Sequence, residues 1–386
     1  LGKKYYLPVH QGRAAENIIA RTFVKQGQCV LTNYHFTTTL AHVNEVGGKI
    51  IELLKDEALI LKSDNPFKGN IDIDKLVEAI ETEGAENVAF IRMEASTNLI
   101  GGQPFSIRNM MDVRQVADKY GIILVLDASL LGENAYLVKQ REEEWKENTM
   151  ADIIKMMTGL ADIVYFSARK LTSSRGGGIC TNRRDYYKQM EPLITLFEGF
   201  LTYGGISIRE IEAMAVGIYE TIDETMISQS VDFIKYCVES AVKAGIPMVT
   251  PPGVLGAHVN AGEFCSHIPQ HEYPAGALTA AFYLCSGIRG MERGTASSVR
   301  DAEGNEVLAD VELMRLAFPR RVFTLSQTKY VVDRLSWLYE NRHLIGGLKF
   351  SYEPAILRFF MGELEPLSDW PSKIVHKFRK DFGDSL

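Results

Sequence analysis

Short apolar runs alternate with helical patterns through the first half of this chain, and this alternation restricts its fold more than any other feature. The runs that read as strands are Cys29–Leu31, Lys49–Leu53, Val88–Met93, Ile122–Leu126, Ile163–Phe166 and Gly178–Cys180. The segments with helical spacing between them are Ala14–Lys25, Asp72–Glu83, Ile107–Tyr120 and Met150–Leu160. Such an order predicts an α/β fold, in which helices cover a mostly parallel sheet.

The second half begins with a different pattern. A long helical stretch runs from Ile208 through Ala244, and the turn-forming residues Pro251-Pro-Gly253 follow it. Beyond this point the pattern indicates a smaller α+β unit. We therefore expect a large domain over residues 1–222 and a small C-terminal domain over residues 223–386.

The composition narrows the class of protein. The 386 residues, 46% of them hydrophobic and 24% charged, are enough for two domains with substantial cores. A net charge of −7 without a dense basic stripe argues against nucleic acid as a partner. The five cysteines follow no metal-binding spacing, so we expect reduced thiols and no metal site. No apolar run is long enough for a membrane span or a signal peptide, which favours a cytoplasmic protein that acts on a small molecule.

Lys170 follows the strand Ile163–Phe166, with Ser167 and Arg169 beside it. A lysine in such a place suits a carbonyl cofactor that is held as a Schiff base with its phosphate nearby. Asp127 ends an earlier apolar strand, where an enzyme that uses pyridoxal 5′-phosphate places the acid next to the pyridine nitrogen. Both segments fall where loops leave strand ends, which is where open α/β sheets bind ligands. Alone, a basic dipeptide after a strand is more often a solvated loop.

Motifs across nearly the whole chain, in order, resemble the β-eliminating lyases, the family of tyrosine phenol-lyase and tryptophan indole-lyase (tryptophanase). They are His10–Asn17, Phe36–Thr39, Asn98–Pro104, Asp127–Ser129, Glu133–Tyr136, Ser167–Lys170, Tyr203–Gly205, Met291–Gly294, Arg315–Arg321, Tyr352–Pro354 and Arg358–Phe360. The resemblance implies the type I, aspartate aminotransferase-like fold of enzymes dependent on pyridoxal phosphate. It also implies a homo-oligomer, a dimer or a tetramer.

The resemblance assigns the cofactor-binding residues. It implies that Lys170 forms the covalent link to pyridoxal phosphate, that Asp127 pairs with the pyridine nitrogen and that Phe36 stacks on the ring. Residues expected to hold the phosphate or to line the rest of the cofactor site are Gln11, Gly12, Arg13, Ser167, Asn98 and Ser129. The phosphate loop also has a physical basis, because Gly12 lets backbone N–H groups approach an anion at a helix N-terminus.

Other matching residues concern the substrate. Arg315 and Asn98 match the residues that bind the amino acid's carboxylate in this family, and the planar guanidinium of arginine suits that task. Arg293, Thr37 and Phe359 match tyrosine phenol-lyase, where they surround the phenol, and Phe360 lies beside them. For the two phenylalanines, plain core packing is the alternative interpretation.

Several positions depart from the family. Leu130 stands where an arginine near the cofactor's ring oxygen is expected, and Leu171 stands where aspartate follows the lysine. Arg175 takes the place of an asparagine that helps to bind a monovalent cation, so we expect its charge to replace the metal. The family's N-terminal arm would lie upstream of Leu1, and we expect either a missing N-terminus or a segment cut from a longer polypeptide.

We therefore predict a lyase that depends on pyridoxal phosphate and catalyses α,β-elimination of an L-amino acid, as tyrosine phenol-lyase does, to pyruvate, ammonia and a leaving group. Two alternatives keep the cofactor and change the bond: a cysteine-type carbon–sulfur lyase and a tryptophan indole-lyase. A third, of another class, is a non-catalytic homologue that serves as a binding or assembly partner.

Overall fold

The computed structural model describes residues 1–298, 300–301, 303–354 and 358–383. The chain forms two compact units: unit 1 comprises Leu1–Ala58 and Asn65–Val231, and unit 2 comprises Leu59–Asp64 and Asp232–Leu386. The division falls at Val231, whereas the sequence suggested a boundary after residue 222. The early segment belongs to unit 2 because the N–H of Thr250 donates to the carbonyl of Leu61 and its hydroxyl donates to the carbonyl of Ser63.

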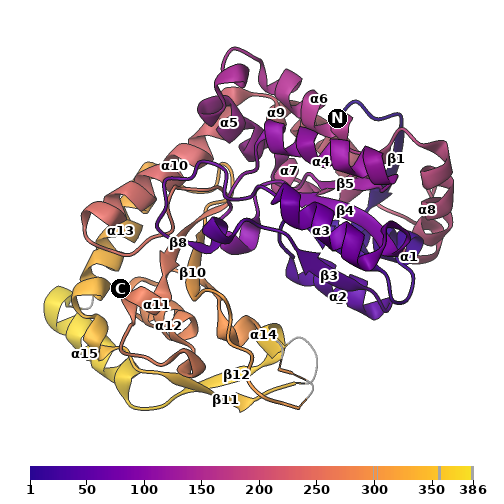
Figure 1. Ribbon diagram of the computed structural model, residues 1–386. Coiled ribbons are helices and arrows are strands. Elements are labelled where there is room, and N and C mark those ends of the chain that lie inside the picture. Colours follow the sequence, from indigo (N-terminus) through magenta and orange to yellow (C-terminus); the bar gives the residue numbers. More distant parts are fainter. Residues whose placement is uncertain (299, 302, 355–357, 384–386) are drawn as a thin grey trace. The chain divides into compact units, whose positions relative to one another are not determined.

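Unit 1 is built on a seven-stranded sheet (Figure 1). Its strands are β1 (Tyr5–Val9), β2 (Cys29–Thr32), β3 (Lys49–Glu52), β4 (Val88–Glu94), β5 (Leu124–Asp127), β6 (Ile163–Ser167) and β7 (Gly177–Thr181). They lie in the order β1-β7-β6-β5-β4-β2-β3, and the pairs from β3 to β6 are parallel. Only β7 and β1 pair antiparallel with their neighbours. The predicted α/β fold with a mostly parallel sheet is confirmed.

Helices cover this sheet on both faces. Those of unit 1 are α1 (Gly12–Phe23), α2 (Thr37–Glu45), α3 (Ile73–Glu83), α4 (Ile107–Tyr120), α5 (Leu131–Arg141), α6 (Met150–Leu160), α7 (Ala168–Leu171), α8 (Arg184–Phe197) and α9 (Ile208–Thr221). Helix α10 (Glu224–Lys243) crosses the division between the units, and single 3₁₀ turns lie at Asp56–Leu59, Ala85–Asn87, Asn98–Ile100 and Glu143–Trp145. Among the described residues, no helix has the length and apolar character needed to cross a bilayer.

Alternation along each strand builds two cores. Leu124 and Leu126 of β5 pack into the cluster on one face of the sheet, and Val125 between them packs into the cluster on the other. Strand β6 does the same, with Phe166 on one face and Tyr165 on the other. Because both faces are buried, these strands appear in the sequence as continuous apolar runs.

Unit 2 is a smaller α+β unit, as predicted. Its strands β8 (Gly256–Asn260), β10 (Leu313–Ala317) and β9 (Met291–Arg293) form an antiparallel sheet in that order, and β11 (Leu348–Tyr352) pairs with β12 (Glu363–Pro366). Its helices are α11 (Ala261–Phe264), α12 (Pro274–Ser286), α13 (Leu325–Glu340), α14 (Arg358–Met361) and α15 (Trp370–Phe382), with 3₁₀ turns at Gln270–Glu272, Thr295–Ser297 and Arg342–Leu344. Buried side chains of α12, α13 and α15 form its core.

The long helix expected from Ile208 through Ala244 is wrong, because the structure has two helices there. The side chain of Asp223 accepts hydrogen bonds from the N–H groups of Thr225 and Met226, at 2.9 and 3.3 Å, and so starts α10 afresh. Thr221, the last residue of α9, donates its hydroxyl proton to the carbonyl of Leu171 at 2.6 Å. A capping aspartate thus ended the periodic pattern.

Candidate active site

Lys170 lies in the short helix α7, directly after β6. Its amine sits 4.7 Å from the centroid of the Phe36 ring. The residues that follow it are anchored: Leu171 is fully buried, and the N–H of Thr172 donates to the carbonyl of Ala168 at 2.8 Å. The backbone of Lys170 is therefore fixed by its neighbours, while its side chain is only half-buried.

Asp127 ends β5, one strand away from Lys170's strand, and is 5% exposed. Its Oδ1 accepts a hydrogen bond from the N–H of Ser129 at 3.0 Å. Its Oδ2 accepts from the Arg92 guanidinium at 2.8 Å and from the Tyr165 hydroxyl at 3.0 Å. The carboxylate is held from two sides, and Oδ1 keeps a lone pair for a further donor.

Ser167 and Ser129 join the two strand ends. The N–H of Ser167 donates to the hydroxyl oxygen of Ser129 at 3.0 Å. The first residue of α1, Gly12, comes close to the same place, since a Cβ on it would lie 2.9 Å from the Cβ of Ser167. Gln11 precedes Gly12 and is half-buried, whereas Arg13 is exposed. The N-terminus of α1, which favours anions, therefore adjoins the end of β6.

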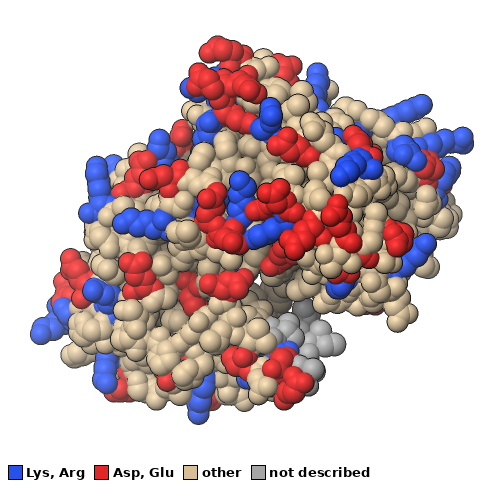
Figure 2. Space-filling view, in the orientation of Figure 1, with Lys and Arg blue, Asp and Glu red and all other residues tan. Residues whose placement is uncertain are grey.

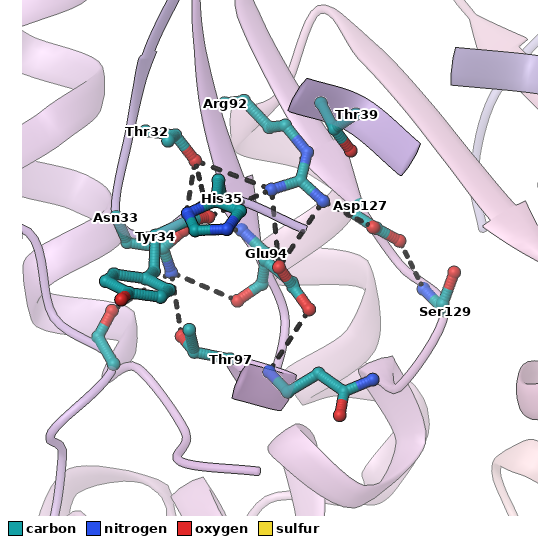
Figure 3. A network of polar contacts seen from close by, with 12 residues as sticks. Thr32, Asn33, Tyr34, His35, Thr39, Arg92, Glu94, Thr97, Asp127 and Ser129 are labelled. Atoms are coloured by element: carbon teal, nitrogen blue, oxygen red, sulfur yellow. Dashed lines mark hydrogen bonds and ion pairs between the residues drawn. The ribbon is translucent and has the colours of Figure 1, made fainter. Parts of the chain in front are cut away.

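A buried ion cluster in β4 lies beside Asp127, and the sequence analysis missed it (Figure 3). Arg92 is 1% exposed and contacts the carboxylates of Asp127 and Glu94. Glu94 also accepts a hydrogen bond from the N–H of Asn98 at 3.2 Å. The signal was available, because two charged residues at alternate positions of a buried strand point to one face.

The charges of this cluster affect one another. Burial raises the pKa of Glu94 to about 7, and the positive charges of Arg92 and Lys170 oppose that rise. Burial alone would lower the pKa of Arg92, but Tyr165, Glu94 and Asp127 raise it well above its ordinary value. Arg92 is thus a permanent cation under the site, and Glu94 is a carboxyl group that gains or loses its proton near neutral pH.

Unit 2 carries the other residues predicted to bind substrate. Arg315 lies on β10 and is half-buried, and burial lowers its pKa. It pairs in register with Met291 and His258, and Arg293 pairs with Leu313 on the same small sheet. The structure therefore brings Arg315 and Arg293 onto neighbouring strands, with His258 on the third.

The remaining predicted residues lie in helices α2 and α14. Thr37 is the first residue of α2 and follows Phe36 directly. In unit 2, Phe359 and Phe360 lie in α14 with ring centroids 5.0 Å apart, and Phe360 is 54% exposed. An aromatic side chain so exposed does not serve as core packing within unit 2. Of the three positions that depart from the family, Leu130 and Leu171 are buried and Arg175 is exposed.

His258 gives the first testable prediction. Burial, together with the nearby charge of Arg315, lowers the pKa of His258 to about 3, and its Nδ1 lies 3.1 Å from the carbonyl oxygen of Gly256. In the unfolded chain the imidazole takes up a proton below about pH 6.5, whereas the folded protein keeps it neutral. Lowering the pH from about 6.5 toward 3 therefore favours unfolding. His258→Gln should remove this loss of stability in acid.

The measurement is the free energy of urea-induced unfolding at about pH 8 and at about pH 5. Between these two pH values, His258 should lower the free energy of unfolding of the wild type by about 2 kcal/mol. His271→Gln is the matched control, because His271 is exposed in the same unit. Equal acid sensitivity in the wild type and in His258→Gln would contradict the prediction.

Comparison with known proteins points to one family. A family model described as beta-eliminating lyase matches residues 1–334. Tyrosine phenol-lyase of Pasteurella multocida (strain Pm70) is 41% identical over 367 residues, which cover 95% of this chain and 80% of that protein. Tyrosine phenol-lyase of Symbiobacterium sp. (strain SC-1) is 39% identical over 369 residues, which cover 95% and 81%.

Solved structures share the fold. Serine palmitoyltransferase from S. paucimobilis, which holds bound PLP, superposes with a TM-score of 0.59 at 12% identity and covers 89% of this chain and 74% of that chain. A chain of the SepCysS complex with the N-terminal domain of SepCysE gives a TM-score of 0.56 at 14% identity and covers 88% and 82%. These likenesses confirm the predicted type I fold of pyridoxal phosphate enzymes.

Proposed function

The chain belongs to the β-eliminating lyase family, and we propose that it binds pyridoxal 5′-phosphate at Lys170 and cleaves L-tyrosine to phenol, pyruvate and ammonia. Family membership makes it a lyase that works by α,β-elimination. The amino acid, the cofactor and the acting residues are the parts that we propose. The observation that carries the choice of tyrosine is the 41% identity to a tyrosine phenol-lyase over 95% of the chain.

The residues around Lys170 fit pyridoxal phosphate. A Cβ on Gly12 would close the space against Ser167, so glycine keeps open a cradle at the N-terminus of α1 where a phosphate fits. Asp127 has a free lone pair on Oδ1 for the protonated ring nitrogen, and the Phe36 ring lies next to the Lys170 amine. When bound, the cofactor supplies a carbonyl that links to amines and a ring that spreads negative charge from the substrate's α-carbon.

The chain's own groups then have distinct tasks. With the cofactor and substrate bound, Lys170 would take the substrate's α-proton at Nζ. Asn98 and Arg315 bind the carboxylate and so orient the bond to the α-proton. Arg293 and Thr37 polarise the phenol hydroxyl, which favours the keto form of the ring before the carbon–carbon bond breaks. Phe359 and Phe360 exclude water from the aromatic ring.

The test is a panel of L-tyrosine, L-tryptophan, S-methylcysteine and cysteine, with pyruvate release measured for each. We expect the highest kcat/KM for tyrosine. A preference for S-methylcysteine would select the carbon–sulfur lyase, and a preference for tryptophan the indole-lyase. If no amino acid yields pyruvate from protein supplied with the cofactor, the hypothesis of a non-catalytic homologue replaces the proposal.

A variant sharpens the choice. Arg293→Leu removes the cation proposed to act on the phenol hydroxyl and leaves the α-carbon chemistry intact. We expect kcat/KM for tyrosine to fall about 10²-fold, while S-methylcysteine, which needs no tautomer of an aromatic ring, is cleaved as before. An equal loss for both substrates would show that Arg293 does not act on the phenol.

We also propose that the protein is a cytoplasmic homo-oligomer with no nucleic-acid partner. Large apolar side chains are exposed over a single stretch of unit 1: Leu196, Phe197, Phe200, Leu201, Tyr203, Ile208, Val216, Tyr219 and Ile222. Exposed apolar side chains in such number favour burial against another subunit. All five cysteines are free and buried, which suits a reducing compartment. On the face drawn in Figure 2, basic side chains are interspersed with acidic ones.

A further inference from the structure

Arg92 is a buried cation of the site that has no part in the proposed reaction. It lies in the middle of the sheet with 1% of its surface exposed. Its guanidinium donates to Asp127 Oδ2 at 2.8 Å and to Glu94 Oε2 at 3.4 Å (Figure 3). It also donates to the Tyr165 hydroxyl at 2.9 Å. Burying a cation is costly, so its retention here calls for a role beyond packing.

The two carboxylate oxygens of Asp127 have different hydrogen-bond partners. Oδ2 accepts hydrogen bonds from Arg92 and Tyr165, and Oδ1 accepts only the backbone N–H of Ser129 among the described residues. The carboxylate therefore cannot rotate without breaking a charged hydrogen bond. Its one remaining lone pair has a fixed direction, on Oδ1, for a donor from the cofactor.

This inference rests on the proposed function. We propose that Arg92 is a positioning residue that acts through Asp127: it fixes the carboxylate and keeps the cofactor's ring nitrogen less readily protonated than an unpaired aspartate would. A carboxylate already neutralised by a guanidinium attracts a proton or a pyridinium less strongly. Because Arg92 contacts Asp127, its charge would also disfavour a second cation held by that carboxylate.

The other charged groups around Asp127 come from each element that adjoins it. They are Arg92 and Glu94 from β4, Tyr165 from β6 and Glu16 from α1, whose Oε1 accepts from the Tyr165 hydroxyl at 3.3 Å; Lys170 from α7 acts on Glu94. Burial raises the pKa of the Tyr165 hydroxyl, so it stays a neutral donor. Arg92 is thus the only permanent cation that contacts Asp127 among the described residues.

The chemical consequence concerns which bond breaks. A ring nitrogen that is protonated in a smaller fraction of the molecules withdraws less negative charge from the substrate's α-carbon. More of this charge then remains on the α-carbon to expel the β-substituent. Elimination is then favoured over transamination, in which a proton is added to the cofactor instead. Arg92 would thereby act on reaction specificity without touching the substrate.

The experiment uses the full chain loaded with pyridoxal phosphate that carries nitrogen-15 at the ring. The nitrogen chemical shift over a pH series reports the pKa of the ring nitrogen directly. We expect Arg92→Met to raise that pKa by about one to three units and Arg92→Lys, which keeps the charge, to stay near the wild type. Arg92→Met should also form more transamination product for each elimination.

Two further variants keep the test decisive. Tyr165→Phe removes the second donor to Asp127 Oδ2 with almost no change in volume. It should raise the pKa of the ring nitrogen by less than Arg92→Met does. Arg114→Met is the matched control, since Arg114 forms an ion pair with Asp162 at 2.9 Å in the same unit. If Arg92→Met does not fold, a rise in Tyr165→Phe alone supports the inference.

Different results would contradict the proposed function and the role of Arg92. A wild-type protein that binds no cofactor, or shows no nitrogen signal from a bound ring, would overturn the proposed function and this inference with it. A bound cofactor whose ring nitrogen has the same pKa in the wild type, Arg92→Met and Tyr165→Phe would overturn the role of Arg92 alone.

Discussion

Lys170→Ala is expected to lower the rate of elimination by about 10⁴-fold. Two losses combine in this variant. The amine that anchors the cofactor is gone, and so is the base that takes the α-proton. The amine of Lys170 lies 4.7 Å from the centroid of the Phe36 ring, the side chain expected to stack on the cofactor, so both losses fall on the same group.

Two measurements separate these losses from misfolding. The first is pyruvate release from L-tyrosine, and the second is the visible absorbance of covalently linked cofactor, followed by borohydride reduction and peptide mapping. Lys155→Ala, which removes an exposed lysine of α6, is the control and should change neither. Persistence of the visible band in Lys170→Ala, with reduction at another lysine, would refute the assignment.

The sheet could be predicted because its physics is local. A parallel strand with both faces buried must be apolar along its length, and this pattern appeared at β2, β4, β5 and β6. Strand β1 was not predicted, since Pro8 interrupts its apolar run. A proline is tolerated there because β1 lies at the edge of the sheet, and edge position follows from strand order, which no local pattern contains.

The site was predictable to the same extent. The positions of Asp127 and Lys170 at neighbouring strand ends follow from rules for open α/β sheets, and the structure has both there. The pairing of Arg92 with Asp127 depends on β4 lying next to β5, with Glu94 opposite Asp127 in register. A long-range register of this kind cannot be derived from the spacing of residues along one chain.

The fold of unit 2 shows the same limit. Segment 59–64 pairs with Thr250, nearly two hundred positions later in the chain, and nothing in its composition marks it as part of that unit. By contrast, the break between α9 and α10 was readable, because Asp223 is a capping residue in plain view. Helical periodicity by itself predicts one continuous helix, and the cap at Asp223 is the local signal that divides it.

Arg315→Met is expected to lower kcat/KM for L-tyrosine by about 10²- to 10³-fold, because two charge-assisted hydrogen bonds to the substrate's carboxylate are lost. Since Arg315 has no proposed contact with the cofactor, the visible absorbance of the bound cofactor should be unchanged. Arg289→Met, which removes an exposed arginine of the same unit, is the control and should keep wild-type kinetics.

A ligand comparison then isolates the carboxylate contact. L-Phenylalanine and phenethylamine share the ring and the amine and differ in the carboxylate alone. The wild type should bind phenylalanine more tightly, and Arg315→Met should lose this preference while its affinity for phenethylamine stays the same, because the difference of the two differences reports one interaction. If the variant weakens both ligands equally, Arg315 supports the structure of β10, where burial already lowers its pKa, and another residue binds the carboxylate.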